Sequence, residues 1–318
     1  MQKIWLILTA ALLAVSLVLF TPTNPTSTIR SKLVIATTTS TVDSGLLDYL
    51  KPYFDARFDA DMTWLYLGTG QAIAVASRGD ADILLVHDRA REDAFLAAGN
   101  GIHRVTVMYN DFVIIGPAND PAGIRGAGEA TEAFKRIAEA GESGRALFVS
   151  RGDNSGTHAL EMKIWSALGL DPRGRRWYME AGQGMSPTIR LSSEKQAYTL
   201  SDRGTWVKLK SAFGEALRLQ ILFEGDKILL NPYGLILLNP QKYPQINSEL
   251  AEKFFLFMVS EEGQRLIDSY RVAGEQIFFP AFGKAEDIGL PSEEEEVQFW
   301  VKRLSESGLE PPQYVKQR

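Results

Sequence analysis

The sequence contains no cysteine and only three histidines. Without a thiol there is no disulfide, no thiolate nucleophile, no cysteine-ligated zinc or iron–sulfur centre, and no cysteine for a lipoprotein anchor. His87, His103 and His158 lie far apart, and none belongs to an H-E-x-x-H motif. A zinc enzyme is therefore not indicated, and we predict no metal-cation ligands.

An excess of positive charge is also missing. The chain has 34 Lys and Arg against 39 Asp and Glu, a net charge of −5. Such a balance presents no basic face for nucleic acid, so we expect no nucleic-acid partner. It does not exclude an anionic ligand, because local dipoles rather than net charge decide such a contact.

Two enzyme motifs are absent as well. The sequence has no G-x-S-x-G elbow of the serine hydrolases,. It also has no G-x-x-x-x-G-K-[ST] loop of the nucleotide-binding enzymes,. These two enzyme classes are therefore not indicated. We predict a protein that is not an enzyme and needs no cofactor.

Residues 1–30 are typical of a targeting segment. Lys3 precedes the uncharged apolar run Ile4–Phe20, and Thr21–Thr28 is rich in Pro, Thr and Ser. This pattern predicts a secretory signal peptide or an uncleaved N-terminal anchor. The rest of the chain is then expected to be periplasmic or otherwise extracytoplasmic, with no membrane contact beyond this segment.

The chain of 318 residues, 45% hydrophobic and 23% charged, is long enough for two lobes with their own cores,. Apolar runs at Leu33–Ala36, Met62–Leu67 and Ala81–His87 alternate with stretches of helical periodicity,. This alternation predicts an α/β fold with a mostly parallel sheet covered by helices.

Two longer strands, Val105–Pro117 and Lys227–Asn239, each have apolar halves around a polar middle. We interpret them as two hinge crossings between lobes. The expected division is lobe 1 at 31–112 and 230–318, and lobe 2 at 113–229. Two α/β lobes joined in this way are typical of a hinged binding protein with its ligand cleft between the lobes.

The first candidate binding segment is the hydroxyl-rich turn Thr37–Thr41. It follows the strand Leu33–Ala36 and precedes apolar residues at helical spacing from Leu46 onward. A helix start offers free backbone N–H groups and a partial positive charge. Added hydroxyl groups favour an anion site there. The simpler alternative is that one hydroxyl is an ordinary N-cap.

Two further turns repeat this arrangement. Gly68-Thr69-Gly70 follows the second strand and precedes a helical pattern, although an ordinary tight turn would read the same way,. In the other, the loop Ser150–Asn154 leads into Ser155–His158, which opens a helix. Arg151 in that loop carries a permanently charged, forked group that suits a tetrahedral oxyanion.

The letters Ser-Arg-Gly-Asp occur at Ser77–Asp80 as well as at Ser150–Asp153. The earlier copy follows a helix and precedes a strand, so there we predict Gly79 as a C-cap and Arg78 as a surface residue. Two expectations concern the C-terminal part. Asn247–Tyr270 has the periodicity of one amphipathic helix, and the acidic run Glu293–Glu296 is expected to be a solvated helix start,.

Six segments, in this order, closely resemble the tungstate-binding proteins of bacterial ABC importers: ATTTSTVDSGLL, YLGTGQA, RGDNSGTHALE, GQGM, YTLSDRGT and NPYGLILLNP. The resemblance covers residues 32–290. It implies a type II periplasmic-binding fold and a monomeric solute-binding protein that delivers a tungstate or molybdate oxyanion to an ABC permease with its cytoplasmic ATPase.

The resemblance also implies which residues hold the oxyanion: Thr38, Thr39, Ser40, Gly68, Thr69, Arg151, Ser155, Gly156 and Thr157. Tyr198, Asp202 and Asn231 lie in matching motifs and are expected in a second shell or at the hinge, because a carboxylate beside a dianion would repel it. His158 is expected either to donate to the ligand or support Arg151, or simply to pack.

Several alternatives remain at this point. The same fold could hold molybdate, sulfate or phosphate instead of tungstate, or serve a sensory or adhesive domain. A secreted hydrolase could use Ser155 with His158, although residues one helical turn apart are a poor nucleophile–base pair,.

Overall fold

The computed structural model describes residues 30–316. The chain divides into two units, Met1–Arg30 and Ser31–Arg318, and the description below concerns the second. The predicted signal or anchor segment lies outside the described residues, apart from Arg30. Within the described part, none of the helices combines the length and the apolar character needed to span a bilayer.

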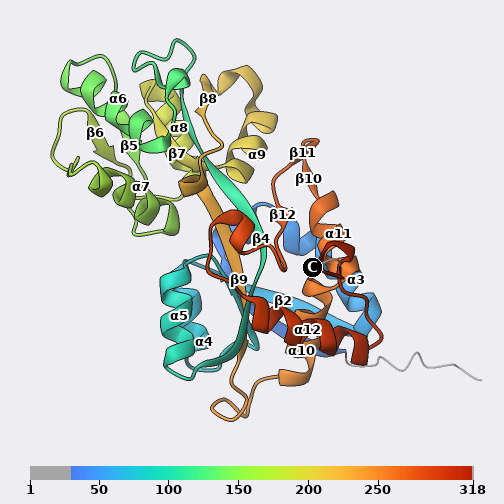
Figure 1. Ribbon diagram of the computed structural model, residues 1–318. Coiled ribbons are helices and arrows are strands. Elements are labelled where there is room, and N and C mark those ends of the chain that lie inside the picture. Colours follow the sequence, from blue (N-terminus) through green and yellow to red (C-terminus); the bar gives the residue numbers. More distant parts are fainter. Residues whose placement is uncertain (1–29, 317–318) are drawn as a thin grey trace, which may run out of the picture. The chain divides into compact units, whose positions relative to one another are not determined.

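The main sheet, of eight strands, has the parallel core that the sequence predicts. Strand β1 (Ser31–Thr38) lies between β2 (Ala60–Leu67) and β3 (Ile83–Val86) and runs parallel to both. The strands β9 (Leu230–Leu238), β4 (Gly101–Pro117) and β12 (Phe279–Pro280) extend this sheet in antiparallel pairs (Figure 1). The carboxyl ends of β1, β2 and β3 therefore meet at one edge.

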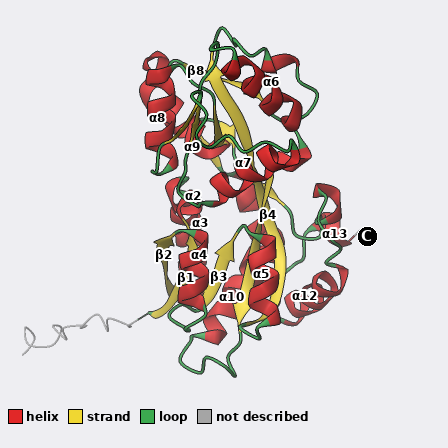
Figure 2. Cartoon of the chain, turned by 90° about the vertical axis from the view of Figure 1, so that its left-hand side faces the viewer, coloured by secondary structure: helices red, strands yellow, loops and turns green. Residues whose placement is uncertain are grey.

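Helices cover both faces of this sheet (Figure 2). Alternate residues of β1 point to opposite faces, so Leu33 and Ile35 join one core cluster while Ala36 joins another with Ala72 of α4,. The helices of this lobe are α2 (Thr39–Asp43), α3 (Leu46–Phe58), α4 (Thr69–Ala76), α5 (Arg89–Ala97), α10 (Ser248–Val259), α11 (Glu261–Ser269), α12 (Glu294–Glu306) and α13 (Gln313–Lys316).

Strands β4 and β9 are the two crossings, as predicted. From Gly101 to Asp111, β4 pairs with β9, and the polar middles of the two strands lie opposite each other at Asn110 and Asn231. From Phe112 onward β4 pairs instead with β7 (Thr199–Asp202) and β8 (Leu219–Phe223). The partners change close to the predicted lobe boundaries, whose exact positions stay predictions.

The second lobe is built around aromatic residues. The ring of Phe134 lies 4.5 Å from that of Trp165, and Phe148 lies 5.5 Å from Trp165, measured between ring centroids. Its other elements are β5 (Phe148–Ser150), parallel to β6 (Tyr178–Glu180), and α6 (Ala130–Glu142), α7 (Gly156–Ala167), α8 (Met185–Lys195) and α9 (Arg203–Phe213).

Short elements connect these parts. They are the small strands β10 (Arg271–Val272) and β11 (Glu275–Gln276) and the 3-10 turns Ile124–Gly126, Gly214–Ala216, Lys227–Leu229 and Glu286–Ile288. The predicted strand from Lys227 therefore begins only at Leu230, after one such turn.

The prediction of one helix over Asn247–Tyr270 is wrong, because α10 and α11 are separate. Ser260 is extended at their junction, and its hydroxyl accepts the backbone N–H of Gly263 as the N-cap of α11. Gly263 has no room for a side chain, since a Cβ there would lie 1.9 Å from the carbonyl oxygen of Phe257. The apolar periodicity continues across this corner, so the sequence pattern does not distinguish two helices from one.

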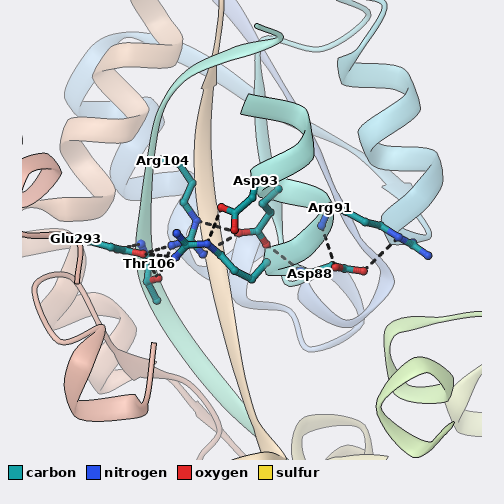
Figure 3. A network of polar contacts seen from close by, with 8 residues as sticks. Asp88, Arg91, Asp93, Arg104, Thr106 and Glu293 are labelled. Carbon is teal, nitrogen blue, oxygen red and sulfur yellow. Dashed lines mark hydrogen bonds and ion pairs between the residues drawn. The ribbon is translucent and has the colours of Figure 1, made fainter. Parts of the chain in front are cut away.

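The prediction of a solvated acidic run is wrong for Glu293. This residue does stand at the start of α12, but its side chain is only 6% exposed and contacts Arg104. It also accepts the backbone N–H of Thr106 at 2.7 Å (Figure 3). The sequence alone gives no sign that an arginine of β4 needs this partner.

Candidate functional site

A pocket of about 510 Å³ lies between the two lobes. The lining residues come from the ends of strands and the starts of helices in both lobes. They are Thr38, Thr39, Gly68, Thr69, Gly70, Gln71, His87, Arg91, Phe112, Arg151, Asp153, Asn154, Ser155, Gly156, Thr157, Asp202 and Asn231. This set includes every residue that the sequence analysis predicted to hold the ligand, except Ser40.

The hydroxyl-rich turn joins β1 to α2. Thr38 ends the strand and is buried, with its hydroxyl 3.1 Å from that of Thr41, and Thr39 begins the helix. Thr37 is used elsewhere, because its hydroxyl donates to the carbonyl of Leu85 in β3. Thr38 and Thr39 line the pocket, while the side chain of Ser40 lies outside what the structure describes.

The second turn joins β2 to α4. Gly68 is the N-cap, and Thr69, Gly70 and Gln71 form the first turn of the helix, which faces the pocket. The backbone N–H groups of a first helical turn have no partner within the helix. They are therefore available to an anion in the pocket, where the helix dipole also favours negative charge.

The third turn, in the second lobe, joins β5 to α7. Ser155 is the N-cap of α7, and its hydroxyl accepts the backbone N–H of His158 at 3.3 Å. Gly156 and Thr157 follow in the first turn, so their N–H groups also face the pocket side of the helix start,. The predicted strand–turn–helix arrangement is present at all three places.

Arg151 is held in a fixed orientation by its neighbours. Its Nη2 lies 2.5 Å and its Nε 3.1 Å from Oδ2 of Asp153, and its Nη1 lies 3.4 Å from the hydroxyl of Thr157. Burial by itself would raise the pKa of Asp153, but the hydrogen bond from Ser155 and the charge of Arg151 hold it below its ordinary value. Arg151 and Asp153 thus form an ion pair inside the pocket.

Asp202 and Asn231 also line the pocket. Asp202 is buried and caps α9 by accepting the backbone N–H of Thr205 at 2.8 Å. Burial raises the pKa of Asp202, so its carboxyl group is easier to protonate than an exposed one,. Asn231 donates to the side-chain oxygen of Asn110 at 2.7 Å, on the two crossing strands.

Tyr198 and His158 are not among the lining residues. The hydroxyl of Tyr198 donates to Asp120 at 2.7 Å and accepts the backbone N–H of Ala122, within the second lobe. His158 accepts the N–H of Asn154 through Nδ1 at 3.0 Å, and its buried Nε2 has no hydrogen-bond partner in the described part of the chain.

His87 is the most informative residue that the sequence analysis missed. It directly follows β3, is half-buried, and has its ring 4.9 Å from that of Tyr233. Burial lowers the pKa of His87 to about 4, so the imidazole is neutral at neutral pH. Its position at the carboxyl end of a parallel strand is a signal that could have identified it.

His87 also brings the lobes together at one point. A Cβ built on Gly156, at the start of α7, would lie 2.8 Å from Cε1 of the His87 ring. A side chain at this position would have to displace the His87 ring, so the glycine permits the close approach,. Gly70, Asp153 and Asn154 lie in the predicted turns and also line the pocket, whereas the lining residues Gln71, Arg91 and Phe112 were not predicted.

The pocket chemistry is that of a donor cage. Its first-turn N–H groups, hydroxyls and two arginines can hydrogen-bond to oxygen atoms of an anion. Among residues 30–316 there is no group of three or more His, Asp or Glu side chains that could hold a metal cation. The arrangement therefore suits a small oxyanion better than a bare cation.

The chain is similar to known proteins in sequence and in fold. A family model described as a PBP superfamily domain matches residues 22–262. The tungstate-binding protein TupA of Peptoclostridium acidaminophilum is 42% identical over 259 residues, which are 80% of this chain and 87% of that protein.

Two solved structures are similar in both sequence and fold. The tungstate-binding protein TupA from Desulfovibrio alaskensis G20 has 45% identity and a TM-score of 0.73, over 79% of this chain and 98% of that one. The structure of the tungstate ABC transporter from Geobacter sulfurreducens has 48% identity and a TM-score of 0.66, over 75% of this chain and 98% of that one.

Proposed function

The chain belongs to the PBP superfamily, and from this premise we propose that it is the extracytoplasmic solute-binding protein of an ABC importer, with tungstate as its favoured ligand. Two similar proteins are named as tungstate-binding, and a further solved structure is that of a tungstate ABC transporter. The permease and its ATPase are the proposed partners, and residues 1–30 the proposed signal or anchor.

One observation carries the proposal. Three separate strand–turn–helix segments, two in one lobe and one in the other, bring their first helical turns to the same pocket. We assign binding to Thr38, Thr39, Gly68, Thr69, Arg151, Ser155, Gly156 and Thr157, with Ser40 as the remaining predicted member. Asp202 and Asn231 support this set, and His158 and Tyr198 support the second lobe.

The mechanism is exchange of water for fixed donors. The anion gives up its hydration shell and receives N–H and O–H groups that each lobe already holds in orientation, so the donors within a lobe need little reorganisation. Each charge-assisted hydrogen bond contributes about 1.5–3 kcal/mol. A handful would approach the ~12 kcal/mol of a nanomolar complex, after the costs of ordering are subtracted.

The pocket volume supports a closing motion. Four oxygen atoms at the ~30 Å³ that water occupies in the liquid take up about 120 Å³. The pocket of about 510 Å³ is several times larger. We therefore propose that the lobes approach further around the anion by bending at β4 and β9, bringing Arg151 closer to it.

The hydrolase alternative receives no support from the local geometry. The Ser155 hydroxyl contacts the backbone N–H of His158, and the imidazole nitrogen Nδ1 of His158 is occupied by Asn154. A nucleophile needs a base within hydrogen-bond reach of its oxygen. We propose a binding protein rather than an enzyme.

Calorimetric titration of the purified protein with tungstate, molybdate, sulfate and phosphate at matched ionic strength tests the proposal. We expect tight one-to-one binding of tungstate and weak binding of sulfate, because cavity size discriminates between anions of equal charge. Tight binding of sulfate or phosphate and weak binding of tungstate would mean that the natural ligand is not tungstate. No binding of any of the four would contradict the function.

A further inference from the structure

The cations of the pocket come from opposite lobes and differ in how well they are paired. Among the described lining residues, Arg91 and Arg151 are the cations, and Asp153 and Asp202 are the carboxylates. Arg151 is only 12% exposed and is bound by Asp153 through two nitrogens. Much of its charge is therefore compensated before any ligand arrives.

Arg91, on α5 of the first lobe, is held much more loosely. Its side chain is 50% exposed, and its ion pair joins Nε to Oδ2 of Asp88 at 3.3 Å. Its two terminal nitrogens have no hydrogen-bond partner in the described part of the chain. Exposed ion pairs of this kind contribute little, so the guanidinium can turn to a better partner.

The position of the Arg91 guanidinium also favours an anion in the pocket. Its Nη1 lies 3.4 Å from where a Cβ on Gly70 would be, over the first turn of α4. A cation beside a helix start is unfavourable, because that end of the helix is itself partly positive. An anion seated on the same first turn would reverse this effect.

A buried polar network holds the start of α5, and with it the backbone of Arg91, at the rim of the pocket. Asp88 caps α5, and its backbone N–H donates to Oε1 of Glu92 at 2.8 Å. The other oxygen of Glu92 accepts from Arg104 at 2.7 and 2.9 Å, and Arg104 contacts Glu293. Figure 3 shows Asp88 between this network and Arg91. The start of α5 is thus anchored, while the Arg91 side chain reaches solvent.

We propose that Arg91 is a second cationic binding residue, supplied by the first lobe, that attracts a divalent oxyanion to the pocket and then contacts it. This inference rests on the proposed function and adds the charge that Arg151, paired with Asp153, supplies only in part. The Coulomb energy scales with ligand charge. Arg91 therefore favours dianions over monoanions of the same shape.

The test compares Arg91→Gln and Arg91→Lys with Arg78→Gln in tungstate binding. Arg78 is a matched control, since it lies on the same lobe, is 59% exposed and pairs with Asp80, but does not line the pocket. Association rates would be measured by stopped-flow fluorescence, and affinities by calorimetry, at low and at high salt.

At low salt we expect Arg91→Gln to weaken tungstate affinity about fivefold, mostly through slower association. Arg91→Lys should keep most of the wild-type affinity, because it keeps the positive charge. High salt should shrink the difference, because exposed charges are screened. Arg78→Gln should match the wild type. Equal rates and affinities for Arg91→Gln and Arg78→Gln would overturn the proposed role of Arg91 and leave the proposed function standing. Absence of tungstate binding in the wild type would overturn the proposed function together with it.

Discussion

The letters Ser-Arg-Gly-Asp occur twice in this chain, and the two copies share two local features, a glycine with positive φ and an Arg–Asp ion pair. Gly79 and Gly152 both have positive φ, +70° and +59°. In each copy the arginine Nε donates to the aspartate two residues later, at 2.7 Å in the first and 3.1 Å in the second. The same four residues thus form the same ion pair in two different surroundings.

What surrounds the two copies differs. Ser77 ends α4 and donates its hydroxyl to the carbonyl of Ile73, which leaves Arg78 59% exposed. The helix C-cap falls on Ser77 rather than on Gly79, so the prediction placed it two residues too late, whereas the surface position of Arg78 is confirmed. The comparison teaches that the same pair becomes a binding group only where a strand end and a helix start flank it.

The second copy is also supported from behind by a buried carboxyl group. Glu161 of α7 is 1% exposed and accepts hydrogen bonds from Tyr178 at 2.6 Å and Trp165 at 3.1 Å. Ser150 is a further partner of Glu161 and accepts the backbone N–H of Gly152 at 3.1 Å. This chain of contacts ties the loop of Arg151 to the core of the second lobe.

The largest effect that we expect comes from Glu161→Gln. Burial raises the pKa of Glu161 from 4.5 to about 7. Between pH 4.5 and about 7 the carboxyl group of Glu161 is protonated in the folded chain and ionised in the unfolded chain. Glu161 therefore stabilises the fold at low pH, and this stabilisation is lost as the pH rises through about 7,. The loss by pH 8 is on the order of 3 kcal/mol and should disappear in Glu161→Gln.

Urea unfolding at pH 4.5 and pH 8 measures this difference in the free energy of unfolding. Glu139→Gln is the control, because Glu139 lies in the same lobe with a 64% exposed side chain. It should follow the wild type at both pH values. Wild type and Glu161→Gln with the same pH dependence would mean that Glu161 stays ionised when folded.

The next effect separates the two arginines. Arg151→Ala should weaken oxyanion binding at least tenfold, because it removes a charge-assisted hydrogen bond worth about 1.5–3 kcal/mol. The thermal stability of the ligand-free protein should hardly change. Arg78→Ala removes the same local ion pair outside the pocket and should leave the affinity within about twofold of the wild type, as exposed pairs contribute little. If Arg151→Ala still bound normally, the neutral donors alone would hold the anion.

The smallest expected effect compares the two glycines. Alanine at positive φ costs roughly 1–2 kcal/mol, so Gly79→Ala and Gly152→Ala should both lower the free energy of unfolding. The clash at Gly79 is with the movable end of Gln245, whereas a Cβ on Gly152 would lie 2.7 Å from Cβ of Glu180. Only Gly152→Ala should also weaken ligand binding. Equal binding losses in both variants would show that the losses follow stability rather than the site.

Much of the fold could be read from local patterns. The strands and helices of the first lobe follow from alternating apolar runs, and the crossings from two strands with polar middles that lie opposite each other at Asn110 and Asn231. Thr38, Thr39 and the Ser155 cap were recognisable because hydroxyls directly before a helix have a clear local role,. These features depend on neighbours along the chain.

The errors arise where distant segments decide. The corner between α10 and α11 at Ser260 keeps the apolar spacing of one helix, and the burial of Glu293 depends on Arg104, 189 residues away. His87 lines the pocket because β3 pairs with β1, and Arg91 lines it because its side chain lies over the start of α4. No short sequence motif indicates either arrangement.

By itself, the sequence determined the three strand–turn–helix segments, the Arg–Asp pair of each Ser-Arg-Gly-Asp copy, and the absence of thiol chemistry. These depend on backbone propensity, capping and residue type, which act over a few residues. Only the tertiary structure decided that one copy faces a pocket and the other faces solvent, and that His87 meets Gly156. Burial, charge pairing and close approach depend on which elements pack together, and distant parts of the chain set that packing.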